Sequence, residues 1–327
     1  MDNQTTVPYF LLLEFSKNRH LQLLHFFLFL VLYLATITAN LLIISAVALD
    51  NRLHSPMYFF LMNLAMQDLG SVSVIVPKSM VNSLTDTRHF SYFGCVAQVF
   101  TFITFAASDL SLLTVITYDR YVAICNPLHY ETVMNWKAFT EIMILVWVAG
   151  LVYGILHTTG TFSIAFCSNV VNQFFCEIPQ LLDLSCSDFN LVEVRVLVAS
   201  VIAGLGCFII VSYAMIFKAV LRIPSEKGRQ KALSTCLPHL LVVSMFVLTG
   251  CFAYLRPPSN TPSYLDFGLT VLYSLLPLLF NPIFYSMRNK NIRFVISKLW
   301  RVREFLLRLF LFCSPPFCMF LSFSFLL

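Results

Sequence analysis

The sequence predicts an all-α membrane protein, a bundle of seven transmembrane helices. Of its 327 residues, 58% are hydrophobic and only 11% are charged, whereas a soluble domain carries about a quarter charged residues. Too few charges remain to cover a surface that faces water. Long apolar stretches also recur along the chain, and each is long enough to cross roughly 30 Å of hydrocarbon. Lipid is therefore the expected solvent for most of the chain.

The seven apolar stretches are expected to be helices, because backbone groups in lipid have no water to bond. They cover residues 24–49, 57–83, 95–124, 138–160, 194–222, 232–254 and 265–287. This divides the chain into an N-terminal segment (1–23), a transmembrane domain (24–287), a short basic amphipathic helix (288–304) and an unusually apolar tail (305–327).

The distribution of basic residues predicts an outside N-terminus and a cytoplasmic C-terminus. Cytoplasmic connections are enriched in Lys and Arg, and this orientation places most of the 21 basic residues inside. The inside set is Arg52, Arg120, Lys137, Lys218, Arg222, Lys227, Arg229, Lys231 and the seven from Arg288 to Arg308. The sequence Asn3-Gln4-Thr5 is a glycosylation acceptor that requires the same orientation.

Four cysteines fall on the outer side, at the start of the third span and in the long loop 161–193. They are Cys95, Cys167, Cys176 and Cys186. That compartment is oxidising, so disulfides are favoured there. A bridge from Cys95 to the loop would place the loop over the mouth of the bundle. The sequence leaves all three pairings of the four cysteines open.

Two acids, Asp68 and Asp109, lie inside otherwise apolar spans, where a carboxylate is costly and usually functional. Counting residues from the cytoplasmic ends of their spans puts both at a depth of about 16 Å, so they are expected to share one site. Asn40 and Asn281 would add oxygen ligands, and a hard cation such as Na⁺ suits this set. The alternative is a protonated, hydrogen-bonded pair that only ties the helices together.

The triplet Asp119-Arg120-Tyr121 ends the third span on the cytoplasmic side. One interpretation is an interfacial arginine that extends towards the lipid headgroups. The other is a latch in which Asp119 pairs with Arg120 at rest and releases it to a partner on activation. The triplet by itself does not separate the two.

Further motifs follow in order along the chain. They are Pro56-Met57-Tyr58-Phe59-Phe60-Leu61, Tyr118-Asp119-Arg120-Tyr121-Val122-Ala123-Ile124-Cys125, Pro127-Leu128-His129-Tyr130, Ser212-Tyr213, Lys231-Ala232-Leu233-Ser234-Thr235-Cys236-Leu237-Pro238-His239-Leu240 and Asn281-Pro282-Ile283-Phe284-Tyr285. In this combination and spacing the chain resembles the olfactory receptors, a family of rhodopsin-like G-protein-coupled receptors. The resemblance covers about residues 8–303.

The resemblance implies bridges Cys95–Cys176 and Cys167–Cys186, and a sodium site at Asp68 and Asp109. It implies no other cofactor. The implied G-protein latch and switch residues are Asp119, Arg120, Tyr121, Tyr213, His239, Asn281, Pro282 and Tyr285. The implied partners are a small hydrophobic odorant, the lipid membrane and a stimulatory, olfactory-type G protein that raises cyclic AMP. The implied location is the plasma membrane of sensory-neuron cilia.

The outer half of the third span is apolar above Asp109, so an amine ligand is not expected. Residues 265–287 contain no Lys, which excludes a retinal Schiff base in the last span. An apolar pocket with few polar groups suits a small hydrophobic ligand. By resemblance its lining is Phe102, Ile103, Ala106, Val198, Val201, Val247, Cys251, Tyr254, Val271 and Ser274, with Tyr254 and Ser274 as hydrogen-bonding groups.

The chain departs from the family pattern at four places. Ala39 stands where Gly is usual, Asp109 where Glu is usual, and Phe246-Val247 where Phe-Tyr is usual. The apolar segment 305–327 extends past the usual end of the family. Either this tail is a read-through or altered terminus, or it is an interfacial anchor in which Cys313 and Cys318 are acylated.

Two other classes of function are the alternatives to a receptor. A transporter or channel would use Asp68 and Asp109 as an ion or proton relay, but no paired internal repeat is obvious. An intramembrane enzyme is not expected, because neither acid has a nucleophilic partner in the sequence and no hydrolase motif is present.

Overall fold

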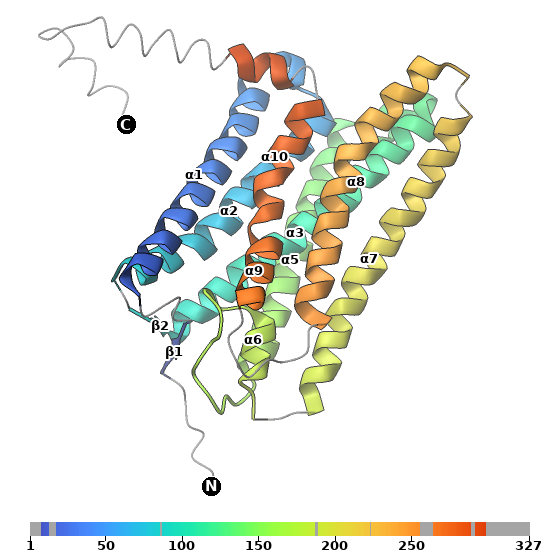
Figure 1. Cartoon of the computed structure of the whole chain (residues 1–327). Helices are drawn as coiled ribbons and strands as arrows, with labels where there is room; N and C mark the ends of the chain where they lie inside the picture. Colours follow the sequence, from blue (N-terminus) through green and yellow to red (C-terminus); the bar gives the residue numbers. More distant parts are fainter. Residues whose placement is uncertain are drawn as a thin grey trace, which may run out of the picture.

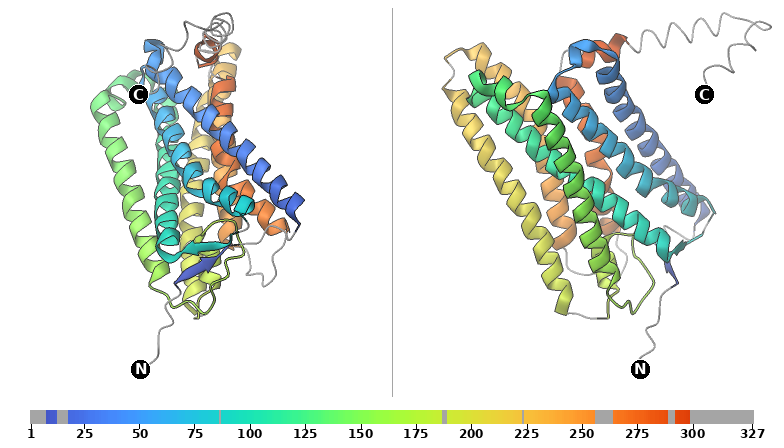
Figure 2. Two further views of the ribbon diagram at one scale, coloured as in Figure 1. Left: turned by 90° about the vertical axis from the view of Figure 1, so that its left-hand side faces the viewer. Right: turned by 180° about the vertical axis from the view of Figure 1, so that it is seen from behind.

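The apolar stretches expected to be helices are helices in the computed structural model, which describes residues 8–12, 18–85, 87–186, 189–222, 224–255, 264–288 and 292–298. The long helices are α1 (Arg19–Leu49), α2 (Pro56–Thr85), α3 (Tyr92–Cys125), α5 (Trp136–Phe162), α7 (Phe189–Leu221) and α8 (Glu226–Leu255), followed by α9 (Tyr264–Ser274) and α10 (Leu276–Arg288). They run side by side along the molecule (Figure 1), and two further views show the same bundle (Figure 2).

Four described helices are long and apolar enough to cross a membrane, namely α1, α2, α3 and α5. Helices α9 and α10 bend by 43° between them and make a fifth crossing if they are one span. In the described parts of α7 and α8, the apolar helical segments are Gly206–Leu221 and His239–Cys251. A membrane bundle of helices is therefore supported, while the count of seven spans and their orientation stay predictions.

Several helices begin where the sequence supplies a polar cap. The side chain of Asn18 accepts from the backbone N–H of His20 at the start of α1, and Asn135 accepts from Ala138 at 2.9 Å at the start of α5. Ser91 accepts from the N–H of Gly94 at the start of α3. Such caps satisfy backbone donors that have no partner within the first helical turn.

Helix α10 contains Pro282, which has no N–H to offer to the carbonyl of Leu278 one turn earlier. The side-chain amide of Asn40 on α1 supplies the missing donor, at 3.0 Å from the Leu278 oxygen. Asn40 is fully buried, and this hydrogen bond fastens α1 to the first turn of α10. Asn40 thus compensates for the backbone hydrogen bond that Pro282 cannot make.

Short elements gather at one end of the bundle (Figure 1). Strand β1 (Tyr9–Leu11) pairs antiparallel with β2 (His89–Ser91), and helix α6 (Ile178–Asp183) lies in the loop after α5. At the other end are the 3-10 turns η1 (Asn51–Leu53) and η2 (Pro127–His129), the single turn α4 (Tyr130–Val133) and the helical residues 292–298. The two strands were not expected from the sequence, because three-residue strands carry no readable alternation.

The helix at 292–298 occupies part of the amphipathic segment predicted at 288–304. Ile292 and Val295 are buried in the main core cluster, whereas Phe294 is exposed. The described part therefore has one buried side and one exposed side, while the amphipathic helix over 288–304 stays a prediction. The tail 305–327, the rest of the amphipathic segment and the acceptor Asn3 lie outside the described residues.

Helix α3 is the centre of the bundle, packing against α2, α5, α7 and α8. Its contact with α5 depends on two glycines four residues apart, Gly150 and Gly154. A Cβ on Gly150 would overlap the hydroxyl of Ser108 and lie 2.8 Å from the carbonyl oxygen of Thr104. Small residues at this spacing let two membrane helices approach closely.

We predict that Gly150→Ala lowers the free energy of unfolding by about 1–3 kcal/mol, the usual cost of overpacking. The backbone of α3 cannot yield as a flexible side chain would. Gly160→Ala on the same helix is the control, because nothing lies within 4 Å of its Cβ position. Thermal unfolding of the purified variants in detergent measures both. Equal stability of the two variants would contradict the close α3–α5 contact.

Candidate ligand-binding site

A cavity of about 210 Å³ lies between α2, α3, α5, α8 and the α9–α10 pair. Its walls are mostly apolar, with several hydroxyl groups and one carboxyl group. The lining residues are Ser71, Phe102, Ile103, Ala106, Ala107, Asp109, Leu110, Ser111, Ala149, Tyr153, Phe246, Thr249, Gly250, Tyr273, Ser274, Pro277 and Leu278. This composition is typical of a site for a small, largely hydrophobic molecule.

Four of the predicted pocket residues line this cavity: Phe102, Ile103, Ala106 and Ser274. Three others do not line it. Val247 faces α7, where a Cβ on Gly206 would lie 2.9 Å from its Cγ1, and Val271 packs in the cluster around Phe29. Cys251 is partly buried elsewhere on α8. The side chains of Val198, Val201 and Tyr254 lie outside the described residues.

The cavity wall also contains Ser71, which was not predicted from the sequence. The hydroxyls of Ser111, Thr249 and Ser274 donate to carbonyls of their own helices, at 2.8, 2.6 and 2.7 Å. Among the described residues Ser71 Oγ has no partner, although Ser71 is buried. Ser71 lies three residues after Asp68, so the two side chains share one face of α2. This spacing is the sequence feature from which Ser71 could have been predicted.

The cavity is roofed by the loop between α5 and α7, and both implied disulfides are confirmed. Cys95 on α3 is bridged to Cys176, and Cys167 to Cys186 within the loop. The Ser79 hydroxyl donates to the carbonyl of Phe174 at 2.7 Å, which ties the loop to α2 as well. These bonds hold the loop over the bundle.

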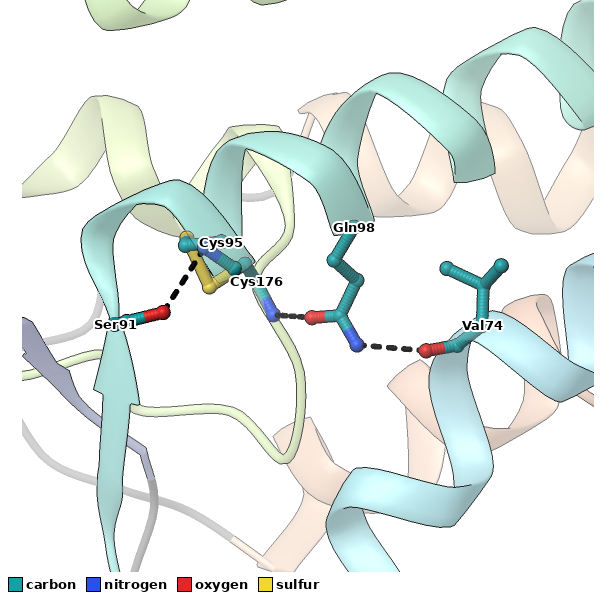
Figure 3. The surroundings of a disulfide bond; sticks show 6 residues. Val74, Ser91, Cys95, Gln98 and Cys176 are labelled. Carbon is teal, nitrogen blue, oxygen red and sulfur yellow. Dashed lines mark hydrogen bonds between the residues drawn. A yellow bond between two sulfur atoms is a disulfide. The ribbon is translucent and has the colours of Figure 1, made fainter.

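Gln98 lies one turn after Cys95 and links three segments (Figure 3). Its amide oxygen accepts from the backbone N–H of Cys176 at 2.9 Å, and its amide nitrogen donates to the carbonyl of Val74 on α2 at 2.8 Å. Gln98 is itself buried. Next to this clamp the ring of Phe102 meets Phe175 edge to face at 5.5 Å, so the roof and the cavity wall are in direct contact.

Asp68 lies below the cavity, fully buried, and both its carboxyl oxygens accept from the side-chain amide of Asn281 at 3.1 Å. Asn40, Asp68 and Asn281 border a separate space of about 10 Å³, the size that holds one water molecule. The side-chain oxygens of Asn40 and Asn281 have no partner among the described residues.

Asp109 lies on the cavity side of this region and interacts electrostatically with Asp68. Its Oδ1 also has no hydrogen-bond partner within the described part of the chain. Oxygen atoms without donors, around a space of this size, are suited to one small cation. No group of three or more His, Cys, Asp or Glu side chains occurs among the described residues, so a transition-metal centre has no support there.

Towards the opposite end of the bundle, His239 connects α3 to α10. Its Nε2 lies 2.9 Å from the hydroxyl of Thr117, and its Nδ1 lies 2.7 Å from the hydroxyl of Tyr285. Thr117 in turn donates to the carbonyl of Leu113. The chain of hydrogen bonds is complete when Nε2 carries the proton, because Tyr285 then donates to Nδ1. Tyr213 places its ring 5.8 Å from that of His239.

At the end of α3, Asp119 and Arg120 form the expected ion pair, with Arg120 Nη2 donating to Asp119 Oδ2. A third partner was not predicted from the sequence: Tyr130 in α4, whose hydroxyl donates to Asp119 Oδ1 at 2.8 Å. Burial and the neighbouring Asp119 carboxylate raise the pKa of Tyr130 above its usual range. Tyr130 therefore keeps its proton at neutral pH and remains a donor. The neighbouring Tyr121 packs against the main core cluster.

This arrangement, a roofed apolar cavity on one side of a buried polar layer and a paired arginine on the other, defines a helical membrane receptor. Residues 29–302 match the olfactory receptor family. The chain is 46% identical to human (Homo sapiens) olfactory receptor 14A16 over 91% of its length and 97% of that protein. It is 47% identical to human olfactory receptor 14C36, covering 92% and 97% of the two chains. It is 39% identical to mouse (Mus musculus) olfactory receptor 2A7, covering 93% and 99%.

The chain therefore belongs to the olfactory receptor family, as its motifs indicated. It is a multi-pass membrane protein of the G-protein-coupled receptor class and not an enzyme.

We predict that Gln98→Leu lowers the free energy of unfolding by about 1–3 kcal/mol, because it leaves the N–H of Cys176 without a partner and removes the hydrogen bond to the carbonyl of Val74. Hydrogen exchange at residues 170–178 should become faster, since the roof loses its tie to α2. Thr101→Val is the matched control on α3, because the Thr101 hydroxyl donates to Ala97 of its own helix and is exposed. If hydrogen exchange at residues 170–178 is unchanged in Gln98→Leu, the hydrogen bonds of Gln98 do not hold the loop in place.

Proposed function

We propose that this protein is an odorant receptor with seven spans and an outside N-terminus, and that it binds small hydrophobic volatile molecules in the 210 Å³ cavity. The observation that carries the proposal is the cavity itself: its walls are mostly apolar, and they include the buried Ser71, whose hydroxyl has no partner among the described residues. A cavity of this composition favours a ligand with a single oxygen atom on a hydrocarbon frame over a charged or strongly polar one.

Signalling is proposed to run from this cavity to Arg120. Asp109 forms part of the cavity wall, and eleven residues later the same helix carries Arg120. The His239 chain joins α3 to α8 and α10 between these two levels. A ligand that shifts α3 against α8 would therefore disturb Thr117, His239 and Tyr285 before it released Arg120 from Asp119.

The proposed partner is a stimulatory, olfactory-type G protein, and the proposed output is a rise in cyclic AMP. The net charge of +5 and the basic residues assigned to the cytoplasmic side suit an acidic partner surface. Tyr121, Asn281 and Pro282 are proposed as further switch residues beside Tyr213 and Tyr285. Membership of the family favours this receptor over the transporter that was the alternative.

Within the cell, the proposed location is the plasma membrane of sensory-neuron cilia, with Asn3 glycosylated outside.

The space bordered by Asn40, Asp68 and Asn281 is proposed to hold a structural Na⁺, with Asp109 contributing from the cavity side. The unpartnered oxygens of the two asparagines support this assignment, because a hard cation is bound by oxygen atoms.

We predict that Ser71→Ala raises the concentration needed for half-maximal response to ketones and esters about fivefold, the effect of one neutral hydrogen bond. Responses to hydrocarbon ligands of the same shape should not change. Ser274→Ala is the matched control, because the Ser274 hydroxyl already donates to Thr270. Dose–response curves for cyclic AMP measure the effect. If Ser274→Ala weakens the response more than Ser71→Ala, the assigned polar contact is wrong.

We predict that NaCl stabilises the purified protein relative to choline chloride, by about 1.4 kcal/mol at ten times the dissociation constant for Na⁺. Asp68→Asn should abolish the difference, because it removes the carboxylate that the cation neutralises. Thermal unfolding in the two salts is the measurement. Equal stability of the unsubstituted chain in both salts would instead support the protonated pair of acids, in which no ion is bound.

A further inference from the structure

A second cavity of about 280 Å³ lies between α7 and α8, apart from the site described above. It is larger than the 210 Å³ ligand cavity. Its lining residues are Tyr213, Phe217, Gln230, Leu233, Cys236, Leu237 and Leu240. Neither Asp119 nor Arg120 is among these, although Arg120 is near enough to interact electrostatically with Tyr213 and Cys236.

The polar atom that distinguishes this cavity is the hydroxyl of Tyr213. Tyr213 is 4% exposed, and within the described part of the chain its hydroxyl has no hydrogen-bond partner. A buried hydroxyl without a partner is unfavourable by roughly 1–3 kcal/mol. The other walls are mainly leucine and phenylalanine side chains, so a molecule that satisfies this hydroxyl must itself be mostly hydrocarbon.

The cavity is elongated and opens on the outside of the bundle, mostly within the predicted spans 194–222 and 232–254. Along α8 its lining extends from Gln230 to Leu240, and ten residues of helix rise about 15 Å. Two of its walls, Phe217 and Leu237, are 47% and 43% exposed on the outside of the bundle. A long, narrow molecule dissolved in the bilayer therefore has a direct route into it.

We propose that this cavity is a second ligand site, which takes an elongated aliphatic molecule carrying one carbonyl oxygen from the membrane. The carbonyl accepts from the Tyr213 hydroxyl, and the hydrocarbon chain lies along Leu233, Leu237 and Leu240. Because the ring of Tyr213 lies 5.8 Å from that of His239, tilted by 38°, and His239 bonds to Thr117 and Tyr285, an occupant holds α7 and α8 in their present arrangement. Such a ligand opposes activation from the first cavity.

The test is photolabelling of the purified full-length chain in nanodiscs by a diazirine analogue of 2-undecanone, with labelled peptides mapped by mass spectrometry. Labels are expected within 213–217 and 233–240. Unlabelled 2-undecanone should compete, whereas undecane, which lacks the carbonyl, should compete at least fivefold less well. The readout is binding, so it does not depend on an odorant response or on a G protein.

Four variants distinguish binding in this cavity from contact with bulk lipid and from binding in the first cavity. Tyr213→Phe keeps the ring and should raise the competing concentration of 2-undecanone about fivefold, while Cys236→Phe should fill the cavity and abolish labelling. Leu241→Phe is the control, since Leu241 is 47% exposed on the same helix and does not line the cavity. Ala106→Trp blocks the first cavity and should leave these labels in place.

The proposal is overturned if undecane competes as well as 2-undecanone, or if 2-undecanone competes equally well in Tyr213→Phe and in the unsubstituted chain. Labels that persist in Cys236→Phe would also overturn it, because they would report general contact with lipid. Loss of the labels in Ala106→Trp would show that the ketone binds only in the first cavity.

Discussion

Polar atoms buried between these helices need hydrogen-bond partners within the protein, and much of the architecture follows from that constraint. Asn40 satisfies a carbonyl that Pro282 leaves without a donor, Asn281 donates to both oxygens of Asp68, and His239 joins Thr117 to Tyr285. These hydrogen bonds connect α1, α2, α3, α8 and α10 through the middle of the bundle. Several buried atoms that stay without partners in the described structure, those of Ser71, Asp109 and Tyr213, line the cavities. At these three positions a polar atom without a partner borders a space with room for a ligand.

Helix α3 connects the loop, the ligand cavity and the signalling end, because residues of this one helix contribute to all three. Cys95 and Gln98 hold the roof, Phe102 to Asp109 form a wall of the ligand cavity, and Thr117 and Asp119-Arg120 lie at the signalling end. Its close packing against α5 at Gly150 and Gly154 fixes it on one side. Movement is then expected on the opposite side, against α7 and α8. There Thr117 of α3 contacts His239 of α8, and a cavity lies between α7 and α8.

The helices, the two disulfides and the Asp119–Arg120 pair were predictable, because each rests on local pattern or on a motif with fixed spacing. The lining of the cavity was predictable only in part. Phe102, Ile103 and Ala106 follow from the helical spacing of α3, whereas Val247 and Val271 turn to other helices, because rotation about a helix axis depends on packing. Ser71 and Tyr130 were missed because single serines and tyrosines carry no pattern. The β1–β2 pair was missed because it joins residues far apart in the sequence.

The central claim is that a ligand bound over Asp109 acts on a G protein through Arg120. The most direct test measures cyclic AMP and ligand binding together, with a panel of volatile ketones and esters, for the unsubstituted chain, Ala106→Trp and Arg120→Ala. We expect a dose-dependent rise in cyclic AMP that both variants lose, with binding lost in Ala106→Trp and kept in Arg120→Ala. A full response from Ala106→Trp at the cell surface, or loss of binding in Arg120→Ala, would contradict the claim.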